Sequence, residues 1–87
     1  MKEIYKLLIT ASAQKELRKL SKIEAERIIP AIKMLASNPR PHGCKKLVAT
    51  KNSYRIRIGN YRVLYHIDDF IRVVEVSGIR HRSEAYE

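Results

Sequence analysis

The stretch SYRIRIGNYRVLYHID, residues 53–68, decides the fold because it predicts a β-hairpin. Runs rich in β-branched and aromatic residues lie on both sides of a turn at Gly59 and Asn60. Side chains two residues apart share one face of a strand, so Arg55 and Arg57 should point the same way, and Arg62 follows just after the turn. The opposite face would carry Tyr54, Ile56, Ile58, Val63, Tyr65 and Ile67. The hairpin therefore predicts a sheet with one face in the core and a basic face left uncovered.

The chain before the hairpin predicts a strand and then a short helix. Residues 4–10, IYKLLIT, are mostly aliphatic, aromatic or β-branched and suit a buried strand. Residues 11–20, ASAQKELRKL, place Ala13, Leu17 and Leu20 on one side of a helix. This apolar stripe would pack on the sheet.

A second helix should follow at once. Ser21 and Glu24 match a capping box, so the helix should begin near Lys22 and run to about Ser37. Its inner face would carry Ala25, Ile28, Ile32 and Leu35. Pro30 lies inside this pattern and should kink or split the helix, because proline has no backbone N–H to donate.

The rest of the chain reads as strands. Residues 37–43, SNPRPHG, should end the helix, and residues 45–49, KKLVA, suit a short strand or an extended segment. A third main strand is expected at residues 70–79, FIRVVEVSGI, and its apolar middle is typical of a central strand. The fold class is therefore α+β, in the order β-α-α-β-β-β: a small, curved, mostly antiparallel sheet with two N-terminal helices packed on one face. Residues 1–87 should form a single domain.

The charge of the chain indicates a polyanionic partner. Eighteen Lys and Arg residues against nine Asp and Glu residues give a formal charge of +9. On a small domain such a charge attracts nucleic acid, an acidic protein or an anionic surface, and it does not choose among them. No apolar run approaches the length that crosses a bilayer, and the apolar segment Leu7–Ile9 is too short for an export signal. We therefore expect a cytoplasmic protein that does not associate with membranes.

Metal and cofactor chemistry finds little support in the sequence. Cys44 is the only cysteine, so no internal disulfide and no thiolate cluster can form. The histidines, His42, His66 and His81, lack the spacing of a metal site. There is also no glycine-rich phosphate loop, so we expect neither metal nor cofactor.

The C-terminal segment adds further candidates for a site. In residues 78–87, GIRHRSEAYE, the basic residues Arg80, His81 and Arg82 should closely follow the last strand, and Tyr86 comes four residues after Arg82. Guanidinium groups bind phosphate through paired hydrogen bonds, and an aromatic ring beside them suits single-stranded RNA. A solvated basic face, or one that binds an acidic protein, explains the same pattern equally well.

Three segments of this chain resemble one family over nearly its whole length. They are SAQKELRKL (residues 12–20), YRIRIGNYRVLYHI (residues 54–67) and GIRHRSEAY (residues 78–86). The chain resembles the RelE/ParE superfamily of bacterial toxins, and its C-terminal segment is most similar to the RelE branch. The resemblance implies a toxin of a type II toxin–antitoxin system that inhibits translation. It would be a ribosome-dependent endoribonuclease, an mRNA interferase, in which a ribose 2′-OH attacks the adjacent phosphate of mRNA in the ribosomal A site.

The same resemblance implies roles for individual residues. The catalytic residues would be Arg55, Arg57, Arg62, Arg80 and Tyr86. Arg82 and His81 would bind RNA.

The sequence departs from well-known members of the family, which carry lysines where this chain has Arg55 and Arg57. Arginine keeps its proton at any physiological pH, so these residues suit phosphate binding and not proton transfer. The resemblance then leaves Tyr86 as the first candidate for the general base, ahead of His81, His66 and the ribosomal RNA itself.

The expected partners also follow from the resemblance. They are a RelB-like antitoxin, an acidic protein that would cover the basic face, and the ribosome with mRNA in its A site. Operator DNA would be bound only through the toxin–antitoxin complex. Two alternatives keep the fold: a ParE-like inhibitor of DNA gyrase without nuclease activity, and an inactive toxin that binds only its antitoxin and DNA.

Overall fold

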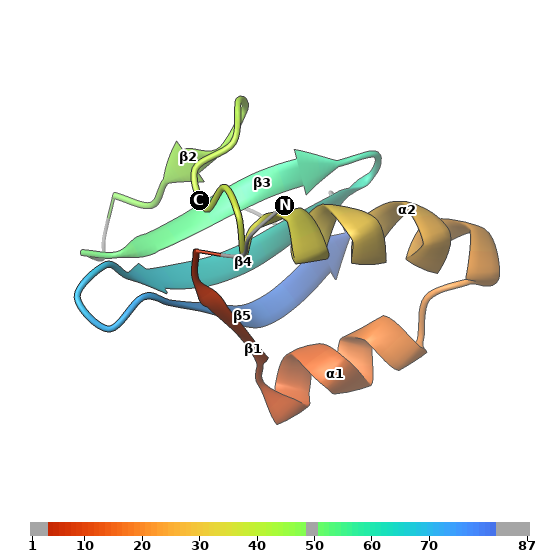
Figure 1. Cartoon of the computed structure of the whole chain (residues 1–87). Coiled ribbons are helices and arrows are strands. Elements are labelled where there is room, and N and C mark those ends of the chain that lie inside the picture. Colours follow the sequence, from red (N-terminus) through yellow and green to blue (C-terminus); the bar gives the residue numbers. More distant parts are fainter. Residues whose placement is uncertain (1–3, 49–50, 82–87) are drawn as a thin grey trace.

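The computed structural model describes residues 4–48 and 51–81, which form a five-stranded sheet with helices on one face (Figure 1). The elements are β1 (Lys6–Ile9), α1 (Ala11–Arg18), α2 (Lys22–Met34), β2 (Lys45–Lys46), β3 (Ser53–Ile58), β4 (Tyr61–Asp68) and β5 (Val73–His81). The strands lie in the order β1-β5-β4-β3-β2. Only β1 and β5 pair in parallel, and the other neighbours are antiparallel. The predicted α+β fold is confirmed.

Both helices begin with side-chain caps. The Thr10 hydroxyl accepts a hydrogen bond from the Ala13 backbone N–H at 3.1 Å. At the start of α2, Ser21 Oγ accepts from the Glu24 N–H at 3.2 Å, and Glu24 Oε1 accepts from the Ser21 N–H at 3.1 Å. This bond from the Ser21 backbone is the largest cause that lowers the pKa of Glu24. The predicted capping box is confirmed, and it fixes where α2 begins.

The end of α2 differs from the prediction. The helix ends at Met34, and the next N–H groups, up to that of Ser37, bond to carbonyls three residues back at 3.0–3.2 Å. The chain thus tightens into a narrower turn before it leaves the helix. Pro30 does not split α2. It lies on the exposed side of the helix, where water can donate to the carbonyl that the missing proline N–H leaves unpaired.

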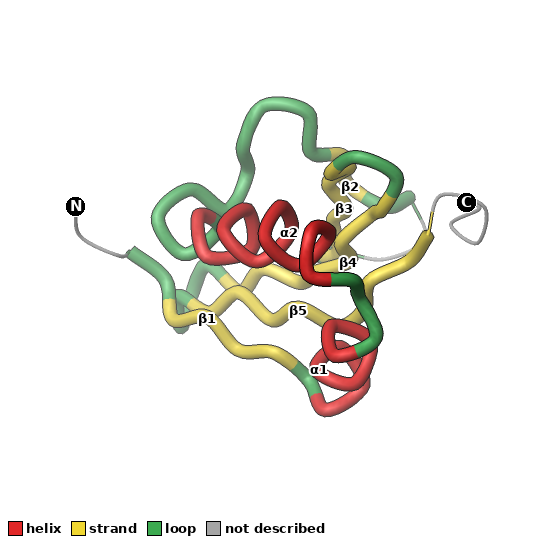
Figure 2. Tube along the Cα trace, turned by 90° about the vertical axis from the view of Figure 1, so that its right-hand side faces the viewer, coloured by secondary structure: helices red, strands yellow, loops and turns green. Residues whose placement is uncertain are grey.

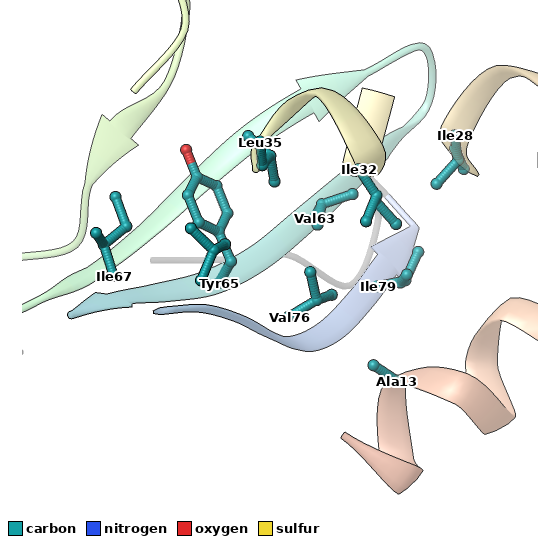
Figure 3. Close-up of a cluster of buried hydrophobic side chains, with 10 residues drawn as sticks. Ala13, Ile28, Ile32, Leu35, Val63, Tyr65, Ile67, Val76 and Ile79 are labelled. Atoms are coloured by element: carbon teal, nitrogen blue, oxygen red, sulfur yellow. The ribbon is translucent and has the colours of Figure 1, made fainter. Parts of the chain in front are cut away.

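In the part of the chain that the structure describes, one apolar core lies between the helices and the sheet (Figure 3). Its buried members are Ala13, Ile28, Ile32, Leu35, Val63, Tyr65, Ile67, Val74, Val76 and Ile79. The predicted inward faces of the hairpin and of α2 are therefore confirmed: Tyr54, Ile56 and Ile58 are half-buried and pack against this cluster, and Ala25 is half-buried as well. Ala13 of α1 and Ile28 and Ile32 of α2 belong to this one cluster, so both helices pack on the same face of the sheet. In Figure 2, α1 lies beside β5. None of the helices within the described residues is long and apolar enough to cross a membrane.

Strand β5 begins three residues later than predicted. The carboxylate of Asp68 accepts hydrogen bonds from the backbone N–H groups of Phe70 and Ile71 at 3.0 and 3.1 Å, which folds these residues into a turn. Arg72 then takes a left-handed conformation with φ of 57°. Phe70 is 95% exposed, so its apolar side chain does not mark a strand position.

At its other end, β5 continues through Arg80 and His81, which were expected after the strand. An irregularity in the register explains how they are placed. Tyr65 pairs with Val76 and Leu64 pairs with Gly78, so Ser77 is an extra residue in β5.

An ion pair ties the β4–β5 turn to two other parts of the chain. Arg40 Nη2 lies 2.8 Å from Asp69 Oδ2, and the Tyr5 hydroxyl donates to Asp69 Oδ1 at 2.6 Å. The Arg40 guanidinium also lies 5.1 Å from the centre of the Tyr54 ring. The bonds from Arg40 and Tyr5 lower the pKa of Asp69. The loop after α2 and the N-terminal segment are thereby fixed to the turn.

We predict that Tyr65→Phe destabilises the fold by about 1–3 kcal/mol, because the buried Tyr65 hydroxyl donates to the Pro39 carbonyl at 2.8 Å and phenylalanine leaves that acceptor unsatisfied. Burial raises the pKa of Tyr65, so the hydroxyl remains a donor at neutral pH. Urea unfolding of both proteins measures the difference. Tyr54→Phe is the matched control, since Tyr54 OH only accepts an exposed bond from Arg40. Equal stabilities of the wild type and Tyr65→Phe would contradict the prediction.

We also predict that Asp69→Asn makes the stability of the protein less sensitive to acid. A carboxyl whose pKa is lowered by folding stabilises the fold above its ordinary value of 3.8, and this stabilisation is lost as the pH falls through the lower folded value. The wild type should therefore exceed Asp69→Asn in urea midpoint at pH 7, and the gap should shrink below pH 3.8. Glu26→Gln, a change at an exposed carboxyl on α2, is the control. A gap that stays constant with pH would refute the prediction.

Candidate nucleic-acid interface

A row of arginines crosses the face of the sheet that the helices leave open. Arg57 on β3 lies opposite Arg62 on β4, and Arg62 lies opposite Arg80 on β5. Directly opposed residues on neighbouring strands point to the same side of a sheet. The structure therefore brings together arginines that are up to 23 positions apart in the sequence, from Arg57 to Arg80.

Beside this row the surface has a shallow hollow of about 250 Å³. Its lining residues are Gly43, Lys45, Arg55, Arg57 and Arg62. Arg55 enters it because it is directly opposite Lys45 on the edge strand β2. Arg57 is oriented by a hydrogen bond of 3.2 Å from its Nε to the Gly59 carbonyl.

Lys45 was not predicted as a site residue. The sequence suggested a short strand at this point, but it gave no register for that strand. Only the pairing of Lys45 with Arg55 shows that its ammonium group joins the arginines. Gly43, with φ of 93°, makes the turn that brings β2 back to the sheet.

Arg80 is held by a residue from the other end of the chain. Its Nη1 donates to Glu16 Oε2 at 2.6 Å, and Glu16 Oε1 accepts from the Ile79 backbone N–H at 2.8 Å. Glu16, on α1, was not predicted either. Its position in an amphipathic helix is typical of an ordinary surface carboxylate, and the sequence held no signal of this contact.

His81 lies on the opposite face from the arginine row. It pairs with Tyr61, and their rings meet edge to face with centres 5.2 Å apart. The Tyr61 hydroxyl in turn donates to Glu24 Oε2 on α2 at 3.1 Å, so this pair faces the helices. The structure therefore does not bring His81 together with the arginines beside which RNA binding was expected.

Another histidine does face the open side. His66 is exposed, lies on the same side of β4 as Arg62, and has Nδ1 at 3.4 Å from the Ser53 hydroxyl. Arg82 and Tyr86, the remaining predicted site residues, lie outside the described residues.

The chemistry of this face suits phosphate. Guanidinium groups and an ammonium group line a hollow open to solvent, and each guanidinium can donate paired hydrogen bonds to phosphate oxygens. Within residues 4–48 and 51–81, no group of three His, Cys, Asp or Glu side chains is arranged to hold a metal ion. This open side of the sheet, with Lys45, Arg55, Arg57, Arg62 and Arg80, is called the basic face below.

Comparison with known proteins defines the class. Residues 7–86 match the family described as ParE toxin of type II toxin–antitoxin systems. A protein named Toxin RelE from Mycobacterium tuberculosis is 35% identical over 83 residues, which cover 94% of this chain and 86% of the relative. The chain belongs to the RelE/ParE superfamily of toxins, as its sequence indicated.

Solved structures narrow the class to RelE-like toxins. In the archaeal RelE–RelB complex from Pyrococcus horikoshii, a chain of 28% identity superposes with a TM-score of 0.82 over 94% of this chain and 99% of that one. In the Escherichia coli RelBE complex, a chain of 27% identity superposes with a TM-score of 0.78 over 95% of this chain and 99% of that one. The isolated E. coli RelE toxin is 28% identical and superposes with a TM-score of 0.79 over 95% of this chain and 88% of that one. The predicted similarity to RelE is confirmed.

Proposed function

We propose that this protein is the toxin of a type II toxin–antitoxin pair and a ribosome-dependent endoribonuclease that cuts mRNA in the A site. The observation that carries the proposal is the row from Arg57 through Arg62 to Arg80, which concentrates guanidinium groups on one uncovered face. A face built only for solvation needs no such row, because like charges in neighbouring positions repel one another. A phosphodiester would offset that repulsion.

The reaction suited to such a face is an internal transfer of the phosphate. The ribose 2′-OH loses its proton and attacks the adjacent phosphorus, and the bond from phosphorus to the 5′ oxygen breaks. The products are a 2′,3′-cyclic phosphate and a 5′-OH, which takes up a proton. Negative charge builds on the phosphorane oxygens in the transition state, and Arg55, Arg57, Arg62 and Arg80 would stabilise it through charge-assisted hydrogen bonds.

The proton of the 2′-OH must go to a group other than these arginines, since a guanidinium does not give up its own proton at neutral pH. His81 faces the helices, which argues against it as the base. His66 shares the open face with Arg62, and an imidazole nitrogen can accept a proton. Tyr86, His66 and the ribosomal RNA are therefore the acceptors that our proposal retains.

The partner that we propose is a RelB-like antitoxin of acidic character. The P. horikoshii and E. coli relatives were each solved in a complex with RelB. A formal charge of +9 on 87 residues would favour a partner of opposite charge that covers the basic face. Operator DNA would then be bound through the antitoxin within the complex.

A ParE-like function is the second candidate, since the matching family carries the ParE name. Such a toxin would inhibit DNA gyrase by binding it, and the basic face would serve as a binding surface without phosphodiester chemistry.

We predict that Arg62→Ala lowers ribosome-dependent cleavage of mRNA by about 10²–10³, because it removes a central donor of the row. Primer extension on a defined mRNA in a reconstituted translation system measures cleavage, with ribosome-free mRNA in a parallel reaction. Arg18→Ala is the matched control, since Arg18 is an exposed arginine on α1.

Cuts within A-site codons that require ribosomes and fade only in Arg62→Ala support the nuclease. If mRNA stays intact with the wild type, the nuclease proposal is wrong. Inhibition of gyrase supercoiling by the same protein would then establish the ParE-like function.

We further predict that the antitoxin associates at a rate that falls at least about tenfold between low and high ionic strength, since charge-steered association is screened by salt. Stopped-flow mixing at several salt concentrations measures this rate, and the dissociation rate should change much less. An association rate independent of salt would rule out a charge-steered interface.

A further inference from the structure

We propose that Glu16 is a positioning residue that holds the Arg80 guanidinium at the end of the arginine row, and that Gly78 provides the space in which the guanidinium lies. The proposal rests on the ribonuclease function proposed above. It adds to the site two residues that never touch the RNA.

The contacts of Glu16 join a helix to the far end of β5. The pairing of β1 with β5 stops at Val76, so the N–H of Ile79 points to an edge that β1 does not cover. One oxygen of the Glu16 carboxylate accepts this N–H at 2.8 Å, and the other accepts from Arg80 Nη1 at 2.6 Å. Arg80 Nη1 also donates to the Ile79 carbonyl at 3.3 Å. The guanidinium is therefore held by two acceptors.

A glycine is needed at position 78 because a larger side chain would collide with Arg80, and not because the backbone there adopts a left-handed conformation. Its φ lies outside the left-handed region, which among the described glycines only Gly43 and Gly59 occupy. A β carbon placed on Gly78 would lie 2.7 Å from Arg80 Nη1 and 3.2 Å from its Cζ. The guanidinium thus lies directly over the Gly78 backbone, and any larger residue would displace it.

The need for a positioning residue follows from charge. Arg62 lies directly opposite Arg80, and Arg57 lies next along the row. Like charges in opposed positions on neighbouring strands repel one another, so the other arginines of the row would not hold Arg80 in place. Glu16 and the Ile79 carbonyl fix the guanidinium over Gly78, at the edge of β5 that β1 leaves uncovered. Arg80 then needs no reorganisation when a phosphate arrives, which is the condition for efficient stabilisation of the transition state.

A purely structural role for Glu16 is the competing explanation, because its bond to the Ile79 N–H also fastens α1 to β5. Glu16→Gln separates the two roles. Its amide oxygen can still accept from Ile79, but its NH₂ group would face the guanidinium, donor against donor.

The test compares Glu16→Gln, Gly78→Ala and the control Glu26→Gln, which removes one carboxylate from an exposed position on α2. Each is made in the wild type and in the Arg80→Ala background. With the toxin in saturating excess over ribosomes, we expect the cleavage rate to fall about ten- to a hundredfold for Glu16→Gln and Gly78→Ala. The toxin concentration that gives half the maximal rate should change little. In the Arg80→Ala background the same changes should alter the rate by less than about twofold. An equal loss in both backgrounds, or none in either, overturns the proposal.

NMR of the arginine side chains gives a readout that does not depend on activity. In the free wild-type toxin, the Arg80 Nη protons should be protected from exchange and shifted from those of an exposed arginine, and both features should be lost in Glu16→Gln. An Arg80 signal already averaged in the wild type overturns the proposal even if the toxin cuts mRNA. A held Arg80 in a toxin that cuts nothing would instead overturn the ribonuclease function, and with it the kinetic role of Glu16.

Discussion

The placement of the basic face depends on one extra residue in β5. Side chains alternate along a strand, so an unbroken β5 would put Ile79 on the side opposite to Val74 and Val76. The core nevertheless contains all three. Ser77 resolves this conflict, because the extra residue reverses the alternation beyond it. Arg80 thereby points away from the core and joins Arg62, so packing of the core and assembly of the arginine row are satisfied by the same irregularity.

Concentrating arginines on one face costs stability through repulsion, and the structure offsets the cost at the two ends of the row. Glu16 binds Arg80 at one end, and the Gly59 carbonyl accepts from Arg57 at the other. Stability comes from elsewhere, from the apolar core and from the ion pair of Arg40 with Asp69. Under the proposed function, this separation of the charged face from the groups that hold the fold together fits a site that carries function at the expense of stability.

The sequence predicted those features that depend on local rules. The hairpin, the capping box at Ser21 and the two faces of β4 follow from turn chemistry, hydrogen bonding and alternation. It failed where a distant contact decided the outcome, and also at one local turn. The bulge at Ser77 breaks the alternation on which strand prediction depends, and Glu16 meets Arg80 across 64 positions of the chain. Phe70 was placed in a strand by its apolar character, whereas the hydrogen bonds to Asp68 make it part of a turn.

Under the proposed function, the arginines at positions 55 and 57 bear on how the toxin would divide its chemistry with the ribosome. A lysine can lose its proton when its pKa is lowered, whereas an arginine acts only as a fixed charge and donor. Under the proposed function, the described part of the basic face would then be a clamp for the phosphate, with His66 as the one histidine on β4 that shares that side. The tight pairing of His81 with Tyr61 makes it a part of the helix-facing surface. Such a clamp would stabilise the transition state through fixed positive charge, so the precision with which Glu16 and Gly78 hold Arg80 would contribute to the rate alongside the proton acceptor.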